Sequence, residues 1–188
     1  VAPTSAPERT LPSLPSLLTN TLAKGEAWPA TNRDLNFRLT ARDGKGGVSS
    51  DDMKIQVVNT GKAFALTSPL VTPLVAGQTQ TIDWDVAGTN AAPINCSKVD
   101  LYMTRDEGVN WTLLAGGQPN SGSASVAIPA GSDGTARLKV ACSDNLFFAI
   151  SPLKLSVTQR VEGGGGGGGA LGFWTLALAL LGWQRRRA

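Results

Sequence analysis

The run QTIDWDVAG, residues 80–88, predicts a β-strand with one buried and one exposed face. Its apolar residues alternate with its acidic ones: Ile82, Trp84 and Val86 against Asp83 and Asp85. Successive side chains of a strand point to opposite faces, so the apolar set belongs in a core. We therefore expect Trp84 to be a core tryptophan rather than a ring that stacks on a ligand.

The same alternation recurs along residues 61–160, in short runs separated by turn residues. The residues expected to face inward are Val99, Leu101 and Met103, then Ala124, Val126 and Ile128, then Ala136, Leu138, Val140 and Cys142. Arg137 and Lys139, between the last four, are expected in solvent. With the remaining runs this gives about seven strands, which is typical of a β-sandwich. We predict an all-β fold with an immunoglobulin-like or fibronectin type III-like sandwich over residues 61–160.

Between two of these strands lies TRDEGVNW, residues 104–111, with the spacing of the Asp-box hairpin. Thr104, Asp106, Gly108 and Trp111 occupy its S/T-x-D-x-G-x-x-W positions. We expect the aspartate to accept hydrogen bonds from backbone amides, the glycine to take a positive φ, and the tryptophan to pack over the turn. This motif builds a turn and performs no chemistry, although it also occurs in sialidases.

The chain has two cysteines, Cys96 and Cys142. If the strands at about 98–103 and 135–141 are antiparallel neighbours, the two side chains come close together. A disulfide is then expected in an exported protein. Two free thiols remain the alternative, because the alternation of side chains along the strand places Cys142 inward but does not place Cys96.

Residues 1–60 contain two further strands joined by a Gly-rich loop. Leu35, Phe37 and Leu39 alternate on one strand, and Met53, Ile55 and Val57 on the other. Two strands are not stable alone in water. We expect this segment to be the last part of a β domain that begins upstream of Val1, or a hairpin that docks on the next domain. A chain numbered from a cleaved signal peptide is the alternative to truncation.

Three aspartates around that loop, Asp43, Asp51 and Asp52, are weak candidates for binding Ca²⁺ between domains. Turn formation by Asp and Gly explains the same residues equally well. We otherwise expect no cofactor in this chain.

The composition excludes several classes of catalytic site. The chain has no histidine, which removes Ser-His-Asp catalysis and the H-E-x-x-H zinc site. Carboxylate pairs need a cleft and a raised pKa, and the acidic residues here fall in turns or on solvent-facing positions. The net charge of +3 equals the charge of Arg185, Arg186 and Arg187 alone, so no basic face remains for nucleic acid. We expect no enzymatic activity and no nucleic-acid binding.

Residues 161–188 predict a membrane segment. The uncharged run of residues 170–183 is shorter than the about 20 residues that a spanning helix needs, and it reaches that length only with the seven glycines before it. Glycine costs roughly 1 kcal/mol per residue in a helix, so this part of the span is weak. Phe173, Trp174 and Trp183 suit the membrane interfaces, and the arginines place the C-terminus in the cytoplasm. The glycines are Gly163, Gly164, Gly165, Gly166, Gly167, Gly168 and Gly169.

A glycine run, a short apolar helix and a terminal arginine cluster together resemble the GlyGly-CTERM sorting signal of Gram-negative bacteria. The resemblance implies export by the type II secretion machinery, a transient inner-membrane stage, and cleavage near the glycines by rhombosortase, an intramembrane serine protease. The mature protein would be at the cell surface or extracellular. An ordinary C-terminal anchor with a flexible linker is the alternative.

Residues 9–158 resemble the region after the catalytic domain in secreted bacterial reprolysin-like zinc metallopeptidases. The similarity rests on sequence segments that contain predicted strands, such as LNFRLTARDGKGGVSSDDMKIQVVNT, DWDVAGTNAAPINCSKVDLYMTRDEG and ARLKVACSDNLFFAIS. It implies an upstream catalytic domain in cis that carries the zinc. This chain would then be a non-catalytic accessory and sorting segment. A stalk or adhesion module without a protease is the alternative, and a carbohydrate-binding sandwich is disfavoured because exposed aromatic residues are few.

Overall fold

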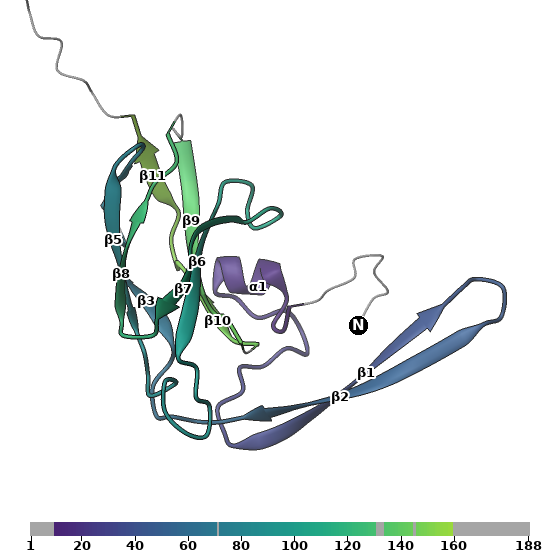
Figure 1. Cartoon of the computed structure of the whole chain (residues 1–188). Coiled ribbons are helices and arrows are strands. Elements are labelled where there is room, and N and C mark those ends of the chain that lie inside the picture. Colours follow the sequence, from purple (N-terminus) through teal and green to yellow (C-terminus); the bar gives the residue numbers. More distant parts are fainter. Residues whose placement is uncertain (1–9, 71, 131–133, 145, 160–188) are drawn as a thin grey trace, which may run out of the picture.

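The computed structural model of this chain describes residues 10–70, 72–130, 134–144 and 146–159. The described residues are mostly β-strand with one short helix, which confirms the all-β prediction (Figure 1). The elements are α1 (Leu14–Thr19), β1 (Arg33–Arg42), β2 (Val48–Val57), β3 (Ala65–Ser68), β4 (Leu74–Val75), β5 (Thr79–Asp85), β6 (Lys98–Thr104), β7 (Thr112–Pro119), β8 (Ser123–Ala127), β9 (Gly134–Cys142), β10 (Phe148–Ile150) and β11 (Leu155–Thr158).

Strands β3 to β11 form two sheets that pack face to face. The larger sheet has the order β4-β11-β9-β6-β7, with β10 also paired to β9, and the smaller has the order β3-β5-β8. These are nine strands where about seven were expected. One of the additional strands, β4, has only two residues and is too short to show an alternating pattern. Strands β6 and β9 are antiparallel neighbours, with Val99 opposite Cys142 and Thr104 opposite Arg137.

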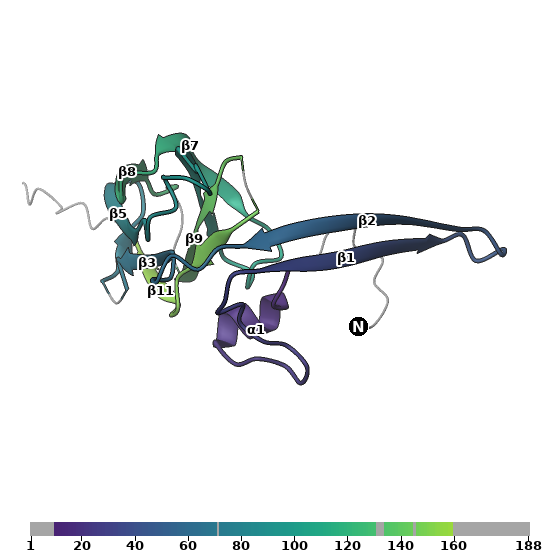
Figure 2. The same cartoon turned by 90° about the horizontal axis from the view of Figure 1, so that it is seen from below.

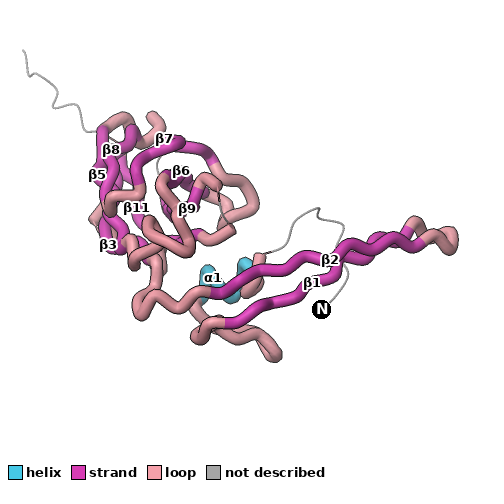
Figure 3. The backbone as a smooth tube through the Cα atoms, turned by 60° about the horizontal axis from the view of Figure 1, so that its bottom comes forward, coloured by secondary structure: helices cyan, strands magenta, loops and turns pink. Residues whose placement is uncertain are grey.

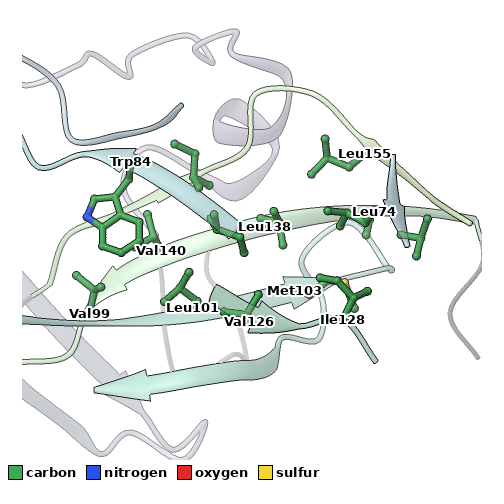
Figure 4. Close-up of a cluster of buried hydrophobic side chains, with 14 of the residues drawn as sticks. Leu74, Trp84, Val99, Leu101, Met103, Val126, Ile128, Leu138, Val140 and Leu155 are labelled. Atoms are coloured by element: carbon green, nitrogen blue, oxygen red, sulfur yellow. The ribbon is translucent and has the colours of Figure 1, made fainter. Parts of the chain in front are cut away.

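The core lies between the two sheets and is built mainly from the alternating residues predicted above (Figure 4). Val86 and Ala124, also predicted to face inward, are half-buried and pack against it. Trp84 is 3% exposed and lies at one end of this cluster. Each large apolar side chain moved from water into such a core contributes about 1.5–3 kcal/mol. The buried residues are Leu66, Leu74, Ala76, Ile82, Trp84, Cys96, Val99, Leu101, Met103, Val126, Ile128, Ala136, Leu138, Val140, Cys142, Leu155 and Val157.

Strands β1 and β2 form a separate antiparallel hairpin that projects away from the two sheets (Figures 2 and 3). Its register places Leu35 opposite Ile55 and Phe37 opposite Met53, so the apolar residues predicted to alternate on each strand share one face. At the root of the hairpin, Asn32 Oδ1 accepts a hydrogen bond from the Asn59 amide at 2.6 Å. The two ends of the hairpin therefore lie together where it joins the body, as we call the two sheets formed by β3 to β11.

No helix among the described residues is long and apolar enough to cross a membrane. The predicted membrane segment, residues 170–183, lies outside the described residues.

Candidate functional site

The Asp-box turn joins β6 to β7 and has the hydrogen bonds that its sequence predicts. The Asp106 carboxylate accepts bonds from the Asn110 amide at 2.8 Å, the Asn110 side chain at 2.6 Å and the Thr104 hydroxyl at 2.8 Å. The Gly108 amide donates to the Thr104 hydroxyl at 3.0 Å. These donors, the Asn110 amide first, lower the pKa of Asp106 to about 2. The folded turn therefore stabilises Asp106 in its charged form.

Gly108 and Trp111 also take their predicted places. Gly108 has a φ of 82°, and a Cβ on it would lie 3.2 Å from the Leu14 side chain and 3.3 Å from that of Trp111. Both side chains thus pack directly on the glycine. Because Leu14 belongs to α1, the turn is also the place where the N-terminal segment contacts the body.

Arg137 is buried, and the prediction that it lies in water is wrong: it is 7% exposed. Its side chain leaves the outer face of β9, as parity requires, but other segments cover that face. Its guanidinium donates to the Ser151 carbonyl at 2.9 Å, the Pro152 carbonyl at 3.2 Å and the Leu18 carbonyl at 2.9 Å. Alternation along one strand cannot show that distant segments will cover it.

Two charged side chains complete the surroundings of Arg137. Its Nε lies 3.6 Å from a Glu107 carboxylate oxygen, and the Lys154 ammonium lies 2.6 Å from the other. The hydrogen bond from Lys154 is the largest cause that lowers the pKa of Glu107. The recess between these side chains, also lined by Thr104 and Thr135, leaves no room for a small molecule. The side chains around Arg137 therefore join α1, the Asp-box turn and residues 151–154 to β9, and they do not form a binding cavity.

Residues 13–26 form a strap that carries α1 across the outer face of the larger sheet. The helix has Pro15 in its first turn and ends at Asn20, which adopts a left-handed φ of 52°. The Glu26 carboxylate returns to accept bonds from the Ser13 amide at 2.8 Å and the Ser16 hydroxyl at 2.6 Å. These bonds, Ser16 first, lower the pKa of Glu26. The strap is thus closed on itself and fixed to the body through Arg137.

Lys139, two residues further along β9, is only partly exposed, so its predicted place in solvent is also corrected. Its ammonium lies 4.5 Å from the ring centroid of Tyr102, 4.3 Å from that of Trp111 and 5.8 Å from that of Phe148. Such cation–π contacts stabilise by about 0.5–2 kcal/mol each, depending on exposure. The ammonium group of Lys139 therefore lies against all three aromatic rings.

Asn120 is a buried polar residue that the sequence analysis missed. It is 4% exposed and accepts a hydrogen bond from the Trp84 indole at 2.9 Å. Its amide nitrogen donates to the Thr89 hydroxyl and to the Cys96 carbonyl, both at 3.0 Å. The only sequence signal was a turn-forming PNSG run, which predicts a loop residue and gives no indication of burial.

Cys96 and Cys142 form a disulfide with a Cα–Cα distance of 6.0 Å, which confirms the predicted bridge. Asp144 lies close enough to complete a group of three metal-ligating residue types. Both sulfurs are bonded to each other, however, and so are not available as thiolates, the form of cysteine that binds metals. The two cysteines of this group are therefore close together because they form the disulfide.

The three aspartates considered for Ca²⁺ lie apart on the hairpin. Asp43 is in the β1–β2 loop, where its carboxylate accepts bonds from the amides of Lys45 and Gly47 at 2.7 and 2.9 Å. Asp51 and Asp52 are successive residues of β2, so their side chains point to opposite faces. Asp52 pairs with Arg38 at 2.6 Å. Asp51 accepts a bond from the Asp52 amide at 3.0 Å. The structure thus gives each carboxylate a local role and does not bring the three together.

The predicted processing and membrane residues lie outside the described residues: the glycines at 163–169, then Phe173, Trp174, Trp183 and the arginines at 185–187. Comparison with known proteins found no matching family model and no matching curated protein.

Proposed function

We propose that this chain is the non-catalytic C-terminal accessory and sorting segment of an exported bacterial zinc metallopeptidase. In this proposal residues 61–160 form an immunoglobulin-like or fibronectin type III-like domain, and residues 161–188 are a sorting tail. The tail crosses the inner membrane as a helix and is cleaved by a rhombosortase-type protease after type II secretion. Zinc would belong to the catalytic domain, since the chain offers no histidine to bind it.

The observation that carries the proposal is the Cys96–Cys142 disulfide together with the composition of the tail. A structural disulfide is typical of proteins that fold in an oxidising compartment, and this one links two core positions. The terminal arginines favour a cytoplasmic C-terminus, which leaves the disulfide-bonded body on the other side of the membrane. Both features thus support the same topology.

The tail is tested by mass spectrometry of the C-terminus after expression in a Gram-negative host that has a rhombosortase. We expect the exported protein to end near the glycine run and to lack the sequence GWQRRRA. A matched variant replaces the glycines at 163–169 with leucine, which lengthens and strengthens the helix. That variant is expected to stay uncleaved in the membrane. An exported wild-type protein with an intact C-terminus would contradict the processing proposal.

A stalk or adhesion module without a protease is the second candidate, favoured by the hairpin that projects from the body (Figure 1). The two candidates are separated by the metal content of the natural polypeptide isolated from its host. Bound zinc and a zinc-binding His/Glu motif in the same reading frame support the peptidase. Their absence from the complete polypeptide supports the stalk.

A further inference from the structure

The hairpin carries an apolar face that is partly open to solvent, with half-buried side chains near the root and exposed ones towards the tip. Leu39 is 72% exposed and Met53 is 50% exposed. The opposite face is polar and carries the Arg38–Asp52 and Lys54–Asp34 ion pairs. Because side chains directly opposite in an antiparallel pair share a face, the register defines the apolar face. It consists of Leu35 with Ile55, Phe37 with Met53, Leu39 with Asp51, and Arg33 with Val57.

Two charges of opposite sign flank this apolar face. Arg33 lies at the root of the hairpin and Asp51 lies towards its tip, and both are exposed. The apolar pairs lie between them. A face with this order, positive at one end and negative at the other, is complementary to a second copy of itself turned end for end.

The shape of the molecule also favours this orientation of two copies. The bulky body lies at the root end of the hairpin (Figures 1 and 2). Two hairpins packed root against root would bring both bodies into the same space. Packing root against tip places the bodies at opposite ends of the contact. A two-fold axis across the strands, between the Leu35–Ile55 and Phe37–Met53 rows, then sets the Arg33–Val57 row of each copy against the Leu39–Asp51 row of the other. Arg33 of each copy lies diagonally across the contact from Asp51 of the other, within reach of its long side chain.

We propose that the chain forms a two-fold symmetric dimer through the apolar faces of its β1–β2 hairpins. The four rows of the face span about 20 Å along two strands that lie about 5 Å apart. A face of this size buries less than the about 800 Å² per partner of a standard interface. The dimer is therefore weak and reversible, and it does not depend on the sorting proposal.

Sedimentation equilibrium of the full chain tests the dimer, in a density-matched detergent because residues 170–183 are apolar. The wild type is expected to show a reversible monomer–dimer equilibrium. Arg33→Glu and Asp51→Arg each place like charges at both symmetric contacts, and each is expected to weaken the dimer about tenfold. Arg42→Glu, an exposed position on the polar face away from the Arg38–Asp52 pair, is the matched control and leaves the dimer unchanged.

The mixture of the two charge variants gives the sharpest result. When one copy carries Arg33→Glu and the other carries Asp51→Arg, the side chains that meet have opposite charges at both contacts. The mixture is therefore expected to dimerise about as well as the wild type, although neither variant does so alone. Circular dichroism checks that each variant keeps its fold. A monomeric wild type at about 200 μM, or a dimer that every variant forms equally through the tail, would overturn the proposal.

Discussion

At the residue scale, the buried polar side chains are the least evident from the sequence and the most informative about how the body is held together. Asn120 links Trp84 of β5 to the segment that carries Thr89 and Cys96. Two of its three hydrogen bonds, to the Trp84 indole and the Cys96 carbonyl, satisfy groups that would otherwise be buried without a partner. Trp84 was predicted to be buried from its alternation, but its indole N–H partner lies 36 residues away.

Substitution of Asn120 by alanine should therefore destabilise the body strongly. The change leaves the Trp84 indole and the Cys96 carbonyl without partners, and each unsatisfied buried group costs about 1–3 kcal/mol. We expect the free energy of unfolding, measured in urea, to fall by about 3 kcal/mol. Asn36→Ala, an exposed position on the hairpin, is the matched control and should change it by less than about 0.5 kcal/mol.

Asp106 predicts a dependence of stability on pH. Its pKa of about 2 in the folded turn lies below the about 3.9 of a free aspartate. A lowered pKa means that the carboxylate stabilises the fold above about pH 4 and that this contribution is lost as the pH falls towards about 2. Asp106→Ala is expected to melt at a lower temperature than the wild type at about pH 7, and the difference should shrink between about pH 5 and about pH 2. A constant difference over that range would contradict this role.

At the scale of elements, the positions of most strands were predictable, whereas the cover over the outer face of the larger sheet was not. The alternation along β9 correctly placed Leu138 and Val140 in the core. It failed for Arg137 because α1, the Asp-box turn and residues 151–154 meet over that side chain. Those contacts join positions up to 119 residues apart, and nothing in the local pattern of β9 encodes them.

The role of Arg137 is tested by Arg137→Met, which keeps much of the apolar length and removes every donor. Three backbone carbonyls then lose a charged donor, and we expect the body to lose about 2–3 kcal/mol of stability. We also expect amide hydrogen exchange in α1 to accelerate well beyond that in β6, since the strap loses its bond to Leu18. Arg42→Met, at the exposed end of β1, serves as the control. Equal protection of α1 in both variants would contradict the clamp.

The disulfide has its own expected contribution. It closes a loop with a sequence separation of 46, for which loop-closure entropy gives about 4 kcal/mol of stabilisation. Replacement of both Cys96 and Cys142 by alanine is therefore expected to lower the free energy of unfolding by about this amount. The wild type in excess reductant should show a comparable loss. Labelling of both thiols in the native, unreduced protein would show that the bridge is absent.

At the scale of the whole molecule, the hairpin shows the limit of what a sequence pattern can predict. The alternation along β1 and β2 predicted the two strands and their apolar residues, and the structure supplied the register. It did not show whether that face would be covered, because this depends on where the root of the hairpin is fixed. In the structure the Asn59–Asn32 hydrogen bond joins the two ends of the hairpin, the strap before β1 is held to the body through Leu18, and the hairpin projects outward (Figure 1).

A hairpin of this kind should be removable without loss of the body. Residues 32 and 58 lie side by side, because Arg33 is paired with Val57, so a short glycine linker in place of residues 33–57 can close the chain without strain. The contacts of β1 and β2 are mainly with each other, so we expect the melting temperature of the body to change by less than about 2 °C. Differential scanning calorimetry measures this, with the intact chain as reference. A loss of cooperative unfolding would mean that the hairpin stabilises the two sheets, whereas an unchanged transition would leave its apolar face free to serve contacts between molecules.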